Sequence, residues 1–392
     1  MRILHVIPSY YPAVRYGGPI RSVHALASAS ARRGHEVHVY TTNVNGSGVS
    51  DVPIGIPVEH DGVRVWYYEC PIGRRLFYAP VMGRALRLKV ESFNIIHTHS
   101  VFLWPTSVAA AAARRFGVPY VVSPRGMLVE DLIRQKNRLA KRAWIGLFER
   151  RNVERAAAIH ATSETEADAI RMLGFNPRKM MVLPNGVDVP PDVGPSVPLG
   201  TSPGRAAVLF LGRINWKKGI DRLILAIAMV PDVELVVAGN DEEKYLPVLV
   251  ELARAAGVAE RIQFLGPVDD VRKWDLLRSA RMLVLPSCSE NFGNVVLEAM
   301  AVGCPVVLTP EVGLAPAVRA VDAGIVAEGA PHMLAAAINM LLGDDGLRRR
   351  MGEAGRQTAR KDFSWDAIAA SMDQVYRDCM SEERKCSAIS LL

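Results

Sequence analysis

The feature that most constrains the fold is a repeated alternation of short apolar runs with segments of helical periodicity. In the first half, helical patterns at 19–33 and 105–116 separate runs rich in β-forming residues; these runs cover residues 2–8, 36–42, 63–69, 94–100 and 119–123. Strands and helices that alternate in this way form βαβ units, whose parallel sheets are covered by helices on both faces. The sequence therefore predicts an α/β fold with a doubly wound parallel sheet.

A second series of the same kind follows residues 189–204, a stretch rich in Pro, Gly and Ser that is typical of a linker. Its apolar runs cover residues 206–212, 233–239, 261–266, 281–287, 304–309 and 324–328. Helical patterns follow these runs and begin near Gly219, Glu243, Asp269, Gly293, Leu314 and Pro331. At 392 residues the chain also exceeds what one hydrophobic core usually organises.

We therefore predict two Rossmann-like doubly wound domains, at 1–188 and 205–362, joined by the linker at 189–204. Ligands of open α/β sheets bind outside the carboxyl ends of the strands. We accordingly expect the two domains to face each other across a cleft that holds the active site. Residues 363–380 predict a last helix that packs back toward the first domain, and residues 381–392 predict a tail.

Composition excludes several classes of protein. No apolar run reaches the roughly 20 residues needed to span a bilayer, and Met1 to Ile7 predict a first β-strand rather than a secretory signal. The five cysteines are odd in number and have no CxxC spacing, which argues against a disulfide framework and a zinc knuckle. We expect a cytoplasmic protein with reduced thiols.

The net charge of +7 is unevenly distributed, because residues 1–190 carry 25 Lys+Arg and 14 Asp+Glu whereas the remainder carries 22 and 26. Two basic stretches, 73–89 and 134–156, interleave cations with Leu, Phe and Trp at near-helical spacing. They predict either peripheral contact with the anionic inner face of the cell membrane or core-packed helices with a solvated face. No nucleic-acid recognition motif accompanies the charge, so we expect no nucleic-acid partner.

The strongest chemical signal lies in residues 288–307, where Glu290 follows an apolar run and Glu298 stands about two turns into the next predicted helix. Their spacing of eight residues allows both carboxylates to line one side of an extended ligand, such as a sugar joined to a ribose. The residues between them offer backbone N–H groups at the mouth of the helix: Asn291, Phe292 and Gly293. The alternative is a capping carboxylate and a surface glutamate.

Two further loops carry phosphate-binding character. Arg213 and Lys218, after the first apolar run of the second domain, offer a planar fork and a point charge to a leaving diphosphate, although a basic loop is usually just solvated. Gly17 and Gly18 precede a helix after the first run of the chain. Glycines there permit close backbone approach to a phosphate, or else form an ordinary tight turn.

In this order, several segments together resemble family 4 of the glycosyltransferases: the GG loop, HTHS at 97–100, SPRGML at 123–128, PNGVD at 184–188, GRINWKKG at 212–219 and ENFGNVVLE at 290–298. The resemblance extends from residue 1 to about residue 380. It implies a GT-B fold, retention of anomeric configuration, and transfer that needs neither a metal nor a resident cofactor. The segment 309–318 departs from the family pattern, so Glu311 receives no role.

By matching motif positions, the resemblance implies that Glu290 holds the donor sugar and Glu298 the ribose. It assigns the diphosphate to Arg213 and Lys218, with Gly17 and Gly18 opposite. His99 matches the position whose imidazole approaches the donor sugar from the first domain.

Four other residues complete the expected substrate site. Gly266 and Val268 match a loop that contacts the nucleobase through backbone groups, and Val295 lies between the two glutamates. Arg125 is expected to lie in the cleft near the acceptor or a phosphate, or else to form a structural salt bridge.

The expected function is retaining transfer of a hexosyl unit from a UDP- or GDP-linked sugar to a saccharide or lipid-linked saccharide, in exopolysaccharide or O-antigen biosynthesis. Two alternatives share the fold. One is a nucleotide-sugar epimerase, which needs no acceptor, and the other is a non-catalytic partner subunit that binds sugar nucleotides.

Overall fold

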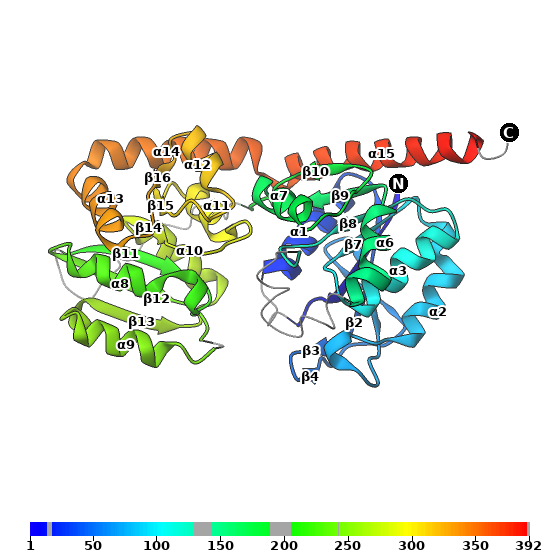
Figure 1. Cartoon of the computed structure of the whole chain (residues 1–392), viewed down its shortest axis with the longest axis horizontal. Helices are drawn as coiled ribbons and strands as arrows, with labels where there is room; N and C mark the ends of the chain where they lie inside the picture. The colour runs from blue at the N-terminus through cyan, green and yellow to red at the C-terminus, as the bar shows by residue number, and fades with distance from the viewer. Residues whose placement is uncertain (14–17, 129–142, 189–204, 242, 390–392) are drawn as a thin grey trace. The chain divides into compact units, whose positions relative to one another are not determined.

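The computed structural model describes residues 1–13, 18–128, 143–188, 205–241 and 243–389 (Figure 1). The chain divides into two compact units. Unit 1 comprises Met1–Gly186 together with Trp365–Leu392, and unit 2 comprises Val187–Ser364. The chain therefore passes between the units twice, after Gly186 and after Ser364.

Unit 1 is built on an eight-stranded sheet of order β10-β9-β8-β7-β1-β2-β6-β5. Neighbouring strands run parallel except β5 and β6, which are antiparallel. The strands are β1 (Arg2–Ser9), β2 (Glu36–Thr42), β5 (Pro57–His60), β6 (Val63–Tyr68), β7 (Ile95–His99), β8 (Tyr120–Ser123), β9 (Ala158–Ala161) and β10 (Met180–Val182), and a separate hairpin joins β3 (Val44–Asn45) to β4 (Gly48–Val49). All five residues of β7 are buried, as expected for a strand covered on both faces.

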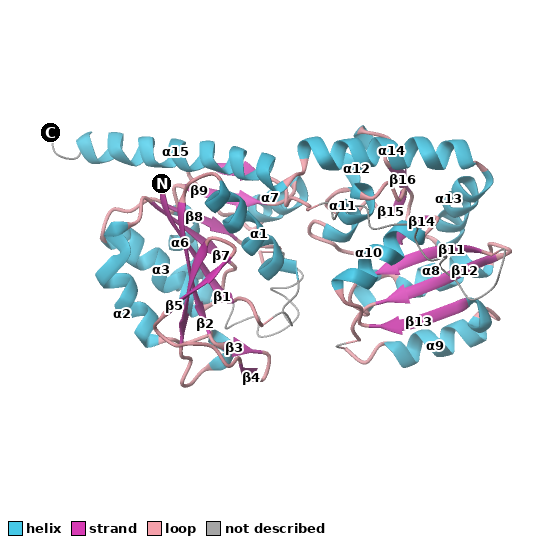
Figure 2. Ribbon diagram, turned by 180° about the vertical axis from the view of Figure 1, so that it is seen from behind, coloured by secondary structure: helices cyan, strands magenta, loops and turns pink. Residues whose placement is uncertain are grey.

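Helices cover both faces of this sheet (Figure 2). Their bounds are α1 (Gly18–Arg32), α2 (Pro80–Lys89), α3 (Trp104–Arg115), α6 (Arg150–Glu154), α7 (Glu164–Met172) and α15 (Trp365–Ile389), with short helical turns at η2 (Arg74–Leu76), η3 (Val90–Ser92) and η4 (Ile145–Glu149). One apolar layer joins Leu4 and Ile96 of the sheet to Leu86 of α2. The opposite layer joins Ile3 and Ile95 to α1 and α15.

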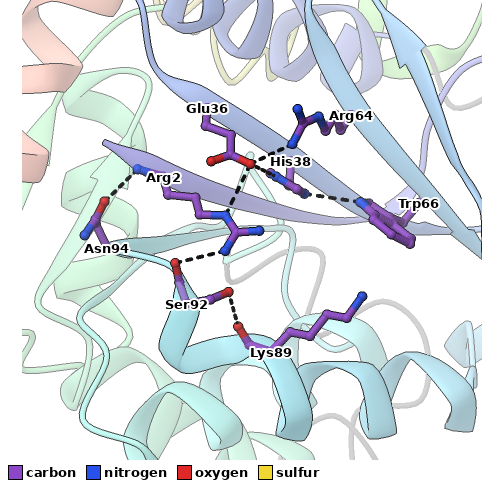
Figure 3. Close-up of polar contacts among 8 residues, drawn as sticks. All are labelled: Arg2, Glu36, His38, Arg64, Trp66, Lys89, Ser92 and Asn94. Carbon is purple, nitrogen blue, oxygen red and sulfur yellow. Dashed lines mark hydrogen bonds and ion pairs between the residues drawn. The ribbon is translucent and has the colours of Figure 1, made fainter.

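The amino ends of β1, β2 and β6 are joined by a polar network around Glu36 (Figure 3). The Glu36 carboxylate accepts from Arg64 Nη1 at 2.7 Å and from His38 Nε2 at 3.0 Å. Trp66 Nε1 donates to His38 Nδ1 at 3.2 Å, so His38 is neutral with its proton on Nε2. The hydrogen bond from His38, supported by Arg2 and Arg64, lowers the pKa of Glu36. The polar side chains at this edge of the sheet are therefore engaged by contacts within the chain itself.

Helix α15 follows unit 2 in the sequence but belongs to unit 1. Its apolar face, which includes Ile368 and Met372, packs in the same cluster as β1 and β7. The buried Asp373 carboxylate lies 2.7 Å from Arg33 Nε and 3.0 Å from His35 Nε2. The helix continues to Ile389, beyond residue 380, where the sequence pattern predicts its end.

Unit 2 contains a six-stranded sheet of order β13-β12-β11-β14-β15-β16, and every pair of neighbours is parallel. The strands are β11 (Ala206–Leu211), β12 (Val233–Ala238), β13 (Ile262–Gly266), β14 (Met282–Leu285), β15 (Val306–Leu308) and β16 (Gly324–Val326). The helical elements are α8 (Ile220–Ala228), α9 (Leu246–Ala255), α10 (Asp270–Ser279), α11 (Asn294–Ala301), α12 (Ala315–Ala320), α13 (Pro331–Gly343) and α14 (Asp345–Asp362), with turns at η5 (Trp216–Lys218) and η6 (Ala259–Arg261). All of these pack into one hydrophobic core.

The predicted fold class is confirmed, because both units are doubly wound parallel sheets. In unit 2 each predicted strand is present, and the helices begin within about three residues of the predicted starts. The sequence pattern missed β5, β9 and β10, which are three or four residues long. Among the described residues, no helix combines the length and the apolar character needed to cross a bilayer.

The Asp373 contacts make a prediction for the attachment of α15. Asp373→Ala leaves the Arg33 guanidinium and the His35 ring beside a buried gap, so we expect unit 1 to lose roughly 1–3 kcal/mol of unfolding free energy, or about 2–12 °C in Tm. Thermal unfolding of the full chain measures this loss. Asp366→Ala is the matched control, because Asp366 also belongs to α15 and pairs with Arg32, the last residue of α1, but is largely exposed, and it should cost less than about 0.5 kcal/mol. Equal losses in the two variants would contradict the assignment.

Candidate active site

Each sheet reverses its strand order at one point, and several of the predicted site residues follow the strands at those points. In unit 1 the order reverses between β1 and β7, and in unit 2 between β11 and β14. A crevice forms where the loops from two neighbouring strands turn away in opposite directions, and open α/β sheets bind ligands there. His99 ends β7, and Glu290 follows β14. Both residues therefore stand at the carboxyl end of a strand beside a switch point.

The loop after β11 carries Arg213 and Lys218. Gly219, with φ of 64°, ends this loop against the carboxyl end of β14. A Cβ at Gly219 would lie 2.0 Å from the Pro286 carbonyl oxygen, so only glycine allows so close an approach. This contact brings the β11 loop and the β14 loop together.

Because the β11 loop and the β14 loop approach each other, Lys218 Nζ forms an ion pair with Glu290 Oε2. Both side chains are mostly withdrawn from solvent, with exposed fractions of 15% for Lys218 and 21% for Glu290. The two residues were assigned separately to the diphosphate and to the donor sugar, and the structure joins them directly. Arg213 is exposed on the same loop.

The backbone around Glu290 is fixed by the segment that follows β15. Glu290 N–H donates to the Glu311 carbonyl at 3.1 Å, and Gly313 N–H donates to the Glu290 carbonyl at 2.9 Å. A Cβ at Gly313 would lie 2.1 Å from the Asn291 carbonyl oxygen. The segment 309–318, which departs from the family pattern, therefore fixes the backbone of the loop that carries Glu290.

The second glutamate belongs to α11, which begins at Asn294 after Gly293 in a left-handed conformation. Glu298 is the fifth residue of the helix, about one turn in. The expectation of two turns is wrong, because the loop extends as far as Gly293 and the helix begins only at Asn294. Glu298 Oε1 accepts from Lys273 Nζ of α10 at 2.8 Å. Lys273 was not predicted, since it stands 25 residues earlier in the chain and no local pattern marks it.

The remaining predicted residues of unit 2 differ in exposure. The Phe292 side chain is buried in the core, so only its backbone is available to a ligand. Asn291, Val295, Gly266 and Val268 are partly buried. Gly266 ends β13 with φ of 70°, and its carbonyl accepts from Gly239 N–H at 2.8 Å.

In unit 1, Gly18 is the first residue of α1, at the carboxyl end of β1. Gly17 lies outside the described residues. The backbone N–H groups of the first turn of a helix have no partner within that helix, so Gly18 stands where an anion can be bound.

His99 lies inside unit 1 and is fully buried. Arg125 Nη2 lies 3.4 Å from His99 Nδ1, and His99 Nε2 lies 2.9 Å from His5 Nδ1. A guanidinium can only donate, so Nδ1 of His99 accepts, Nε2 carries the proton, and His5 Nδ1 accepts it. Both ring nitrogens of His99 are thus engaged by protein groups, and approach to a sugar requires that one of these contacts break.

A second chain of hydrogen bonds runs beside the first. Tyr376 of α15 donates to His97 Nδ1 at 2.8 Å, and His160 Nε2 donates to the Leu183 carbonyl at 2.8 Å. The His97 Nε2 proton then points toward His160 Nδ1, 3.4 Å away. His97 joins α15 to the centre of the sheet, and the sequence pattern did not find His5, His160 or Tyr376.

These four histidines are neutral. Burial, reinforced by the nearby Arg125, lowers the pKa of His5 and of His160 to about 3. Burial likewise holds the pKa values of His97 and His99 well below their usual range. Burial lowers the pKa of Arg125 to about 10, so it is still a cation at neutral pH.

Within the described part of the chain, His5, His97 and His99 are the one group of potential metal ligands whose donor atoms lie close together, within 4.8 Å of one another. Two observations disfavour a bound cation there. The accepting nitrogens of His5, His97 and His99 already receive hydrogen bonds from His99, Tyr376 and Arg125. The guanidinium beside His99 would also repel a metal ion.

Arg125 is held in place by contacts with the chain around it. Its Nη1 donates to Asn185 Oδ1 at 2.7 Å, and its own backbone has φ of 57°. The next residue, Gly126, donates its N–H to Glu166 Oε1 at 2.5 Å. The buried Glu166 carboxylate also raises the pKa of Arg125, opposing part of the effect of burial. The arginine is therefore a fixed cation at the carboxyl end of β8.

Comparisons with known proteins agree with this geometry. Residues 197–358 match the family described as glycosyl transferases group 1, and residues 17–186 match the glycosyl transferase 4-like domain. The D-inositol 3-phosphate glycosyltransferase of Xylanimonas cellulosilytica is 31% identical over 404 aligned positions, which cover 96% of this chain and 95% of that protein. The chain belongs to the group 1 glycosyltransferases.

Solved structures show the same fold for this glycosyltransferase. Sucrose-phosphate synthase from Thermosynechococcus elongatus superposes with a TM-score of 0.76 at 22% identity, covering 97% of this chain and 100% of that one. HepE from Anabaena, in complex with UDP and glucose, superposes with a TM-score of 0.73 at 20% identity, covering 96% and 100%. The predicted membership in a GT-B, group 1 family is confirmed.

The buried histidines predict how the stability of the glycosyltransferase depends on pH. His5 has a pKa of about 3 in the folded protein and about 6.5 in the unfolded chain. Between these values only the unfolded chain binds the proton, so the unfolding free energy falls as pH falls, by up to about 1.4 kcal/mol per pH unit. His5→Gln keeps an acceptor for His99 and removes this titration. We expect its Tm deficit relative to wild type to shrink between pH 7.5 and pH 5.

His332→Gln, at an exposed position on α13, is the matched control. Its Tm difference from wild type should be the same at both pH values. A constant deficit for His5→Gln would show that His5 is accessible to protons in the folded protein.

Proposed function

We propose that this glycosyltransferase transfers a hexosyl unit from a UDP- or GDP-linked sugar to a saccharide or lipid-linked saccharide, with retention of configuration and without a metal. The observation that carries the proposal is the meeting of Lys218 and Glu290, from the loops after β11 and β14, at the switch point of unit 2. A cation for a diphosphate and a carboxylate for sugar hydroxyls stand there side by side. The UDP and glucose bound to the related HepE fold are consistent with this donor class.

In the proposed donor complex, Lys218 and Arg213 bind the diphosphate. Lys218 is already oriented by Glu290, so a diphosphate would replace a carboxylate as its anionic partner. The released Glu290 carboxylate would accept hydrogen bonds from hydroxyl groups of the sugar. Positive groups held in a partly buried site stabilise the charge that grows on the leaving diphosphate more strongly than the same groups in water.

We assign the ribose to Glu298. Its Oε1 is held by Lys273 at 2.8 Å, which leaves Oε2 to accept from ribose hydroxyls. The same segment provides backbone groups for the donor at Asn291, Phe292, Gly293 and Val295. Gly266 and Val268, after β13, would contact the base through their backbones.

From unit 1 we assign His99 and Arg125 to the sugar and to the acceptor or a phosphate, and Gly18, with Gly17, to the diphosphate. Arg125 Nη2 and the His99 ring are in contact, so they would respond to a ligand together. A phosphate or hydroxyl that binds Arg125 would weaken its contact with His99 Nδ1. The imidazole would then become available to the donor sugar.

For the chemical step we propose attack by the acceptor hydroxyl on the face that the leaving diphosphate vacates. No carboxylate is assigned as a nucleophile, so retention would follow from this same-face attack, and a phosphate oxygen of the leaving group would take the proton of the acceptor hydroxyl. The chain would contribute mainly by positioning and by stabilising the diphosphate charge.

The first experiment tests whether turnover depends on Lys218 and Glu290 in particular. We expect Lys218→Ala and Glu290→Ala to lower acceptor-dependent turnover by about 10² to 10³, since each removes an interaction with developing charge or with the sugar. A panel of UDP, GDP and ADP sugars, scored by thermal shift and nucleotide release, measures this. Lys217→Ala is the matched control, because Lys217 lies over the Trp216 ring on the same turn; its turnover should stay within about threefold of wild type.

Other outcomes of this experiment would point elsewhere. Turnover that survives both substitutions would show that the site is wrongly assigned. An epimerised donor formed without any acceptor would support the epimerase alternative. Donor binding without turnover toward any acceptor would support the partner-subunit alternative.

We further propose that unit 1 contacts an anionic membrane at the inner face of the cell membrane, where a lipid-linked acceptor for exopolysaccharide or O-antigen assembly would be found. The observation is the outer face of α2, where Val81, Arg84 and Leu88 follow one another at helical spacing and are all exposed. Leu88 is 84% exposed, so this face presents apolar surface beside its cations, the combination by which helices bind an anionic membrane surface. The second basic stretch lies largely outside the described residues, at 129–142.

The α2 face predicts selective binding to acidic lipids. Replacing Arg84 and Arg87 with Gln and Leu88 with Ser should weaken binding at least tenfold, because each cation contributes about 1 kcal/mol near an anionic surface. Cosedimentation with vesicles of phosphatidylglycerol, against phosphatidylcholine, measures it. Met172→Ser, at an exposed apolar position on α7, should not change binding. Equal binding of the triple variant and wild type would remove the membrane proposal.

A further inference from the structure

Unit 2 contains a second concave site, on the edge of its sheet opposite the one that carries Glu290. This pocket has a volume of about 390 Å³ and lies at the amino ends of three neighbouring strands, β11, β14 and β15. Its charged lining consists of five arginines: Arg205, Arg278, Arg281, Arg348 and Arg349. The other lining residues are small: Ala207, Ser279, Ala280, Gly303 and Pro305. We refer to it as the arginine pocket.

No carboxylate is among the residues that line the arginine pocket. Three carboxylates approach its arginines from outside: Asp345 pairs with Arg348, and Asp275 and Glu234 lie 4.0 Å from Arg278 and Arg205. Arg281 and Arg349 are different. Both are exposed, and within the described residues neither guanidinium has a carboxylate partner within salt-bridge distance. Within the described residues the pocket therefore presents two arginines without a carboxylate partner, and Arg349 Nε donates only to the Asp345 carbonyl, at 3.4 Å.

Helix ends do not account for this concentration of charge. The last turn of α10 ends at Ser279 and α11 ends at Ala301, close to Gly303 of the pocket. Each helix C-terminus carries about half a negative charge. Two such ends could balance about one of the two arginines, Arg281 and Arg349, that have no carboxylate within salt-bridge distance among the described residues.

Two of the arginines are held in place by the chain. Arg348 Nη1 donates to the Leu341 carbonyl at 2.8 Å, and its side chain is only 11% exposed. The side chain of Arg278 is 12% exposed. The backbone of Arg281 is fixed as well, because its N–H donates to the Ala207 carbonyl at 3.0 Å across β11 and β14. An anion entering the pocket would meet two guanidinium groups that are already immobilised, those of Arg278 and Arg348, so less entropy is lost where it contacts them.

We propose that the arginine pocket binds a small soluble ligand that carries a diphosphate or two phosphate groups, at a site separate from the donor site. The planar guanidinium group of an arginine can donate two parallel hydrogen bonds to two oxygens of one phosphate. A volume of about 390 Å³ lies within the range of small-molecule sites. A membrane surface or a nucleic acid would fit a flat or elongated basic face better than a concavity of this size.

The test uses inorganic pyrophosphate as the probe and the full chain in an Arg213→Ala/Lys218→Ala background, which removes the cations proposed for the donor diphosphate. Isothermal titration should detect one remaining pyrophosphate per chain. Adding Arg281→Gln and Arg349→Gln should weaken that binding by about tenfold or more. Both positions are exposed, so the fold should be retained, and an unchanged Tm verifies it.

Arg254→Gln in the same background is the matched control, since Arg254 is exposed on α9 away from the pocket. Its pyrophosphate affinity should equal that of the background. Three results would overturn the proposal: no residual binding in the background, residual binding that Arg281→Gln/Arg349→Gln leaves unchanged, or an equal loss in Arg254→Gln. Loss of phosphatidylglycerol vesicle binding in the pocket variant, without any pyrophosphate binding in the background, would assign the arginines to a lipid surface instead. Because this readout is binding and not transfer, it can fail or succeed independently of the proposed function.

Discussion

The parallel arrangement of strands is the constraint on which the rest of this structure depends. Parallel strands need crossovers, and the crossovers send every strand of a sheet out at the same edge, where the following helices begin. In unit 2 this brings Lys218 into contact with Glu290 although the two residues are 72 positions apart in the sequence. The two ion pairs found there, Lys218 with Glu290 and Lys273 with Glu298, are each formed between neighbouring loops or helices. The edge therefore holds paired charges that a polar ligand can take over, without leaving a buried charge alone in its absence.

The centre of unit 1 depends on a different constraint, which is that a buried polar group must find a partner. Four histidines on β1, β7 and β9 form two hydrogen-bond chains, and the partners of each chain select one set of tautomers. Arg125 fixes the chain from His99 to His5, and Tyr376 of α15 together with the Leu183 carbonyl fixes the chain from His97 to His160. Helix α15 thus completes unit 1 with a hydroxyl group as well as with apolar surface, although it is synthesised after unit 2.

The elements of the fold were predictable from local pattern, and the details of the site were not. A strand such as Met282–Leu285 is a continuous apolar run, and Gly219 and Gly293 mark turns, so these elements can be predicted from residues within one segment. The contact of Lys273 with Glu298 depends on how α10 packs beside α11, and that of His5 with His99 depends on β1 pairing with β7. The engagement of both His99 nitrogens follows from these long-range contacts. A family motif marks the position of His99 but not its partners.

The two edges of the unit 2 sheet differ in how they handle charge, and the difference follows from the backbone. At the carboxyl edge, helix N-termini already attract anions, so lysines and glutamates there can pair with each other and still leave a favourable field for a diphosphate. At the amino edge, helix C-termini expose carbonyl groups, and a binding site for anions can arise only if side chains outweigh them. The five arginines of the arginine pocket do so. A cluster of cations at that edge has to overcome mutual repulsion, and an anionic ligand is the simplest group that would relieve it.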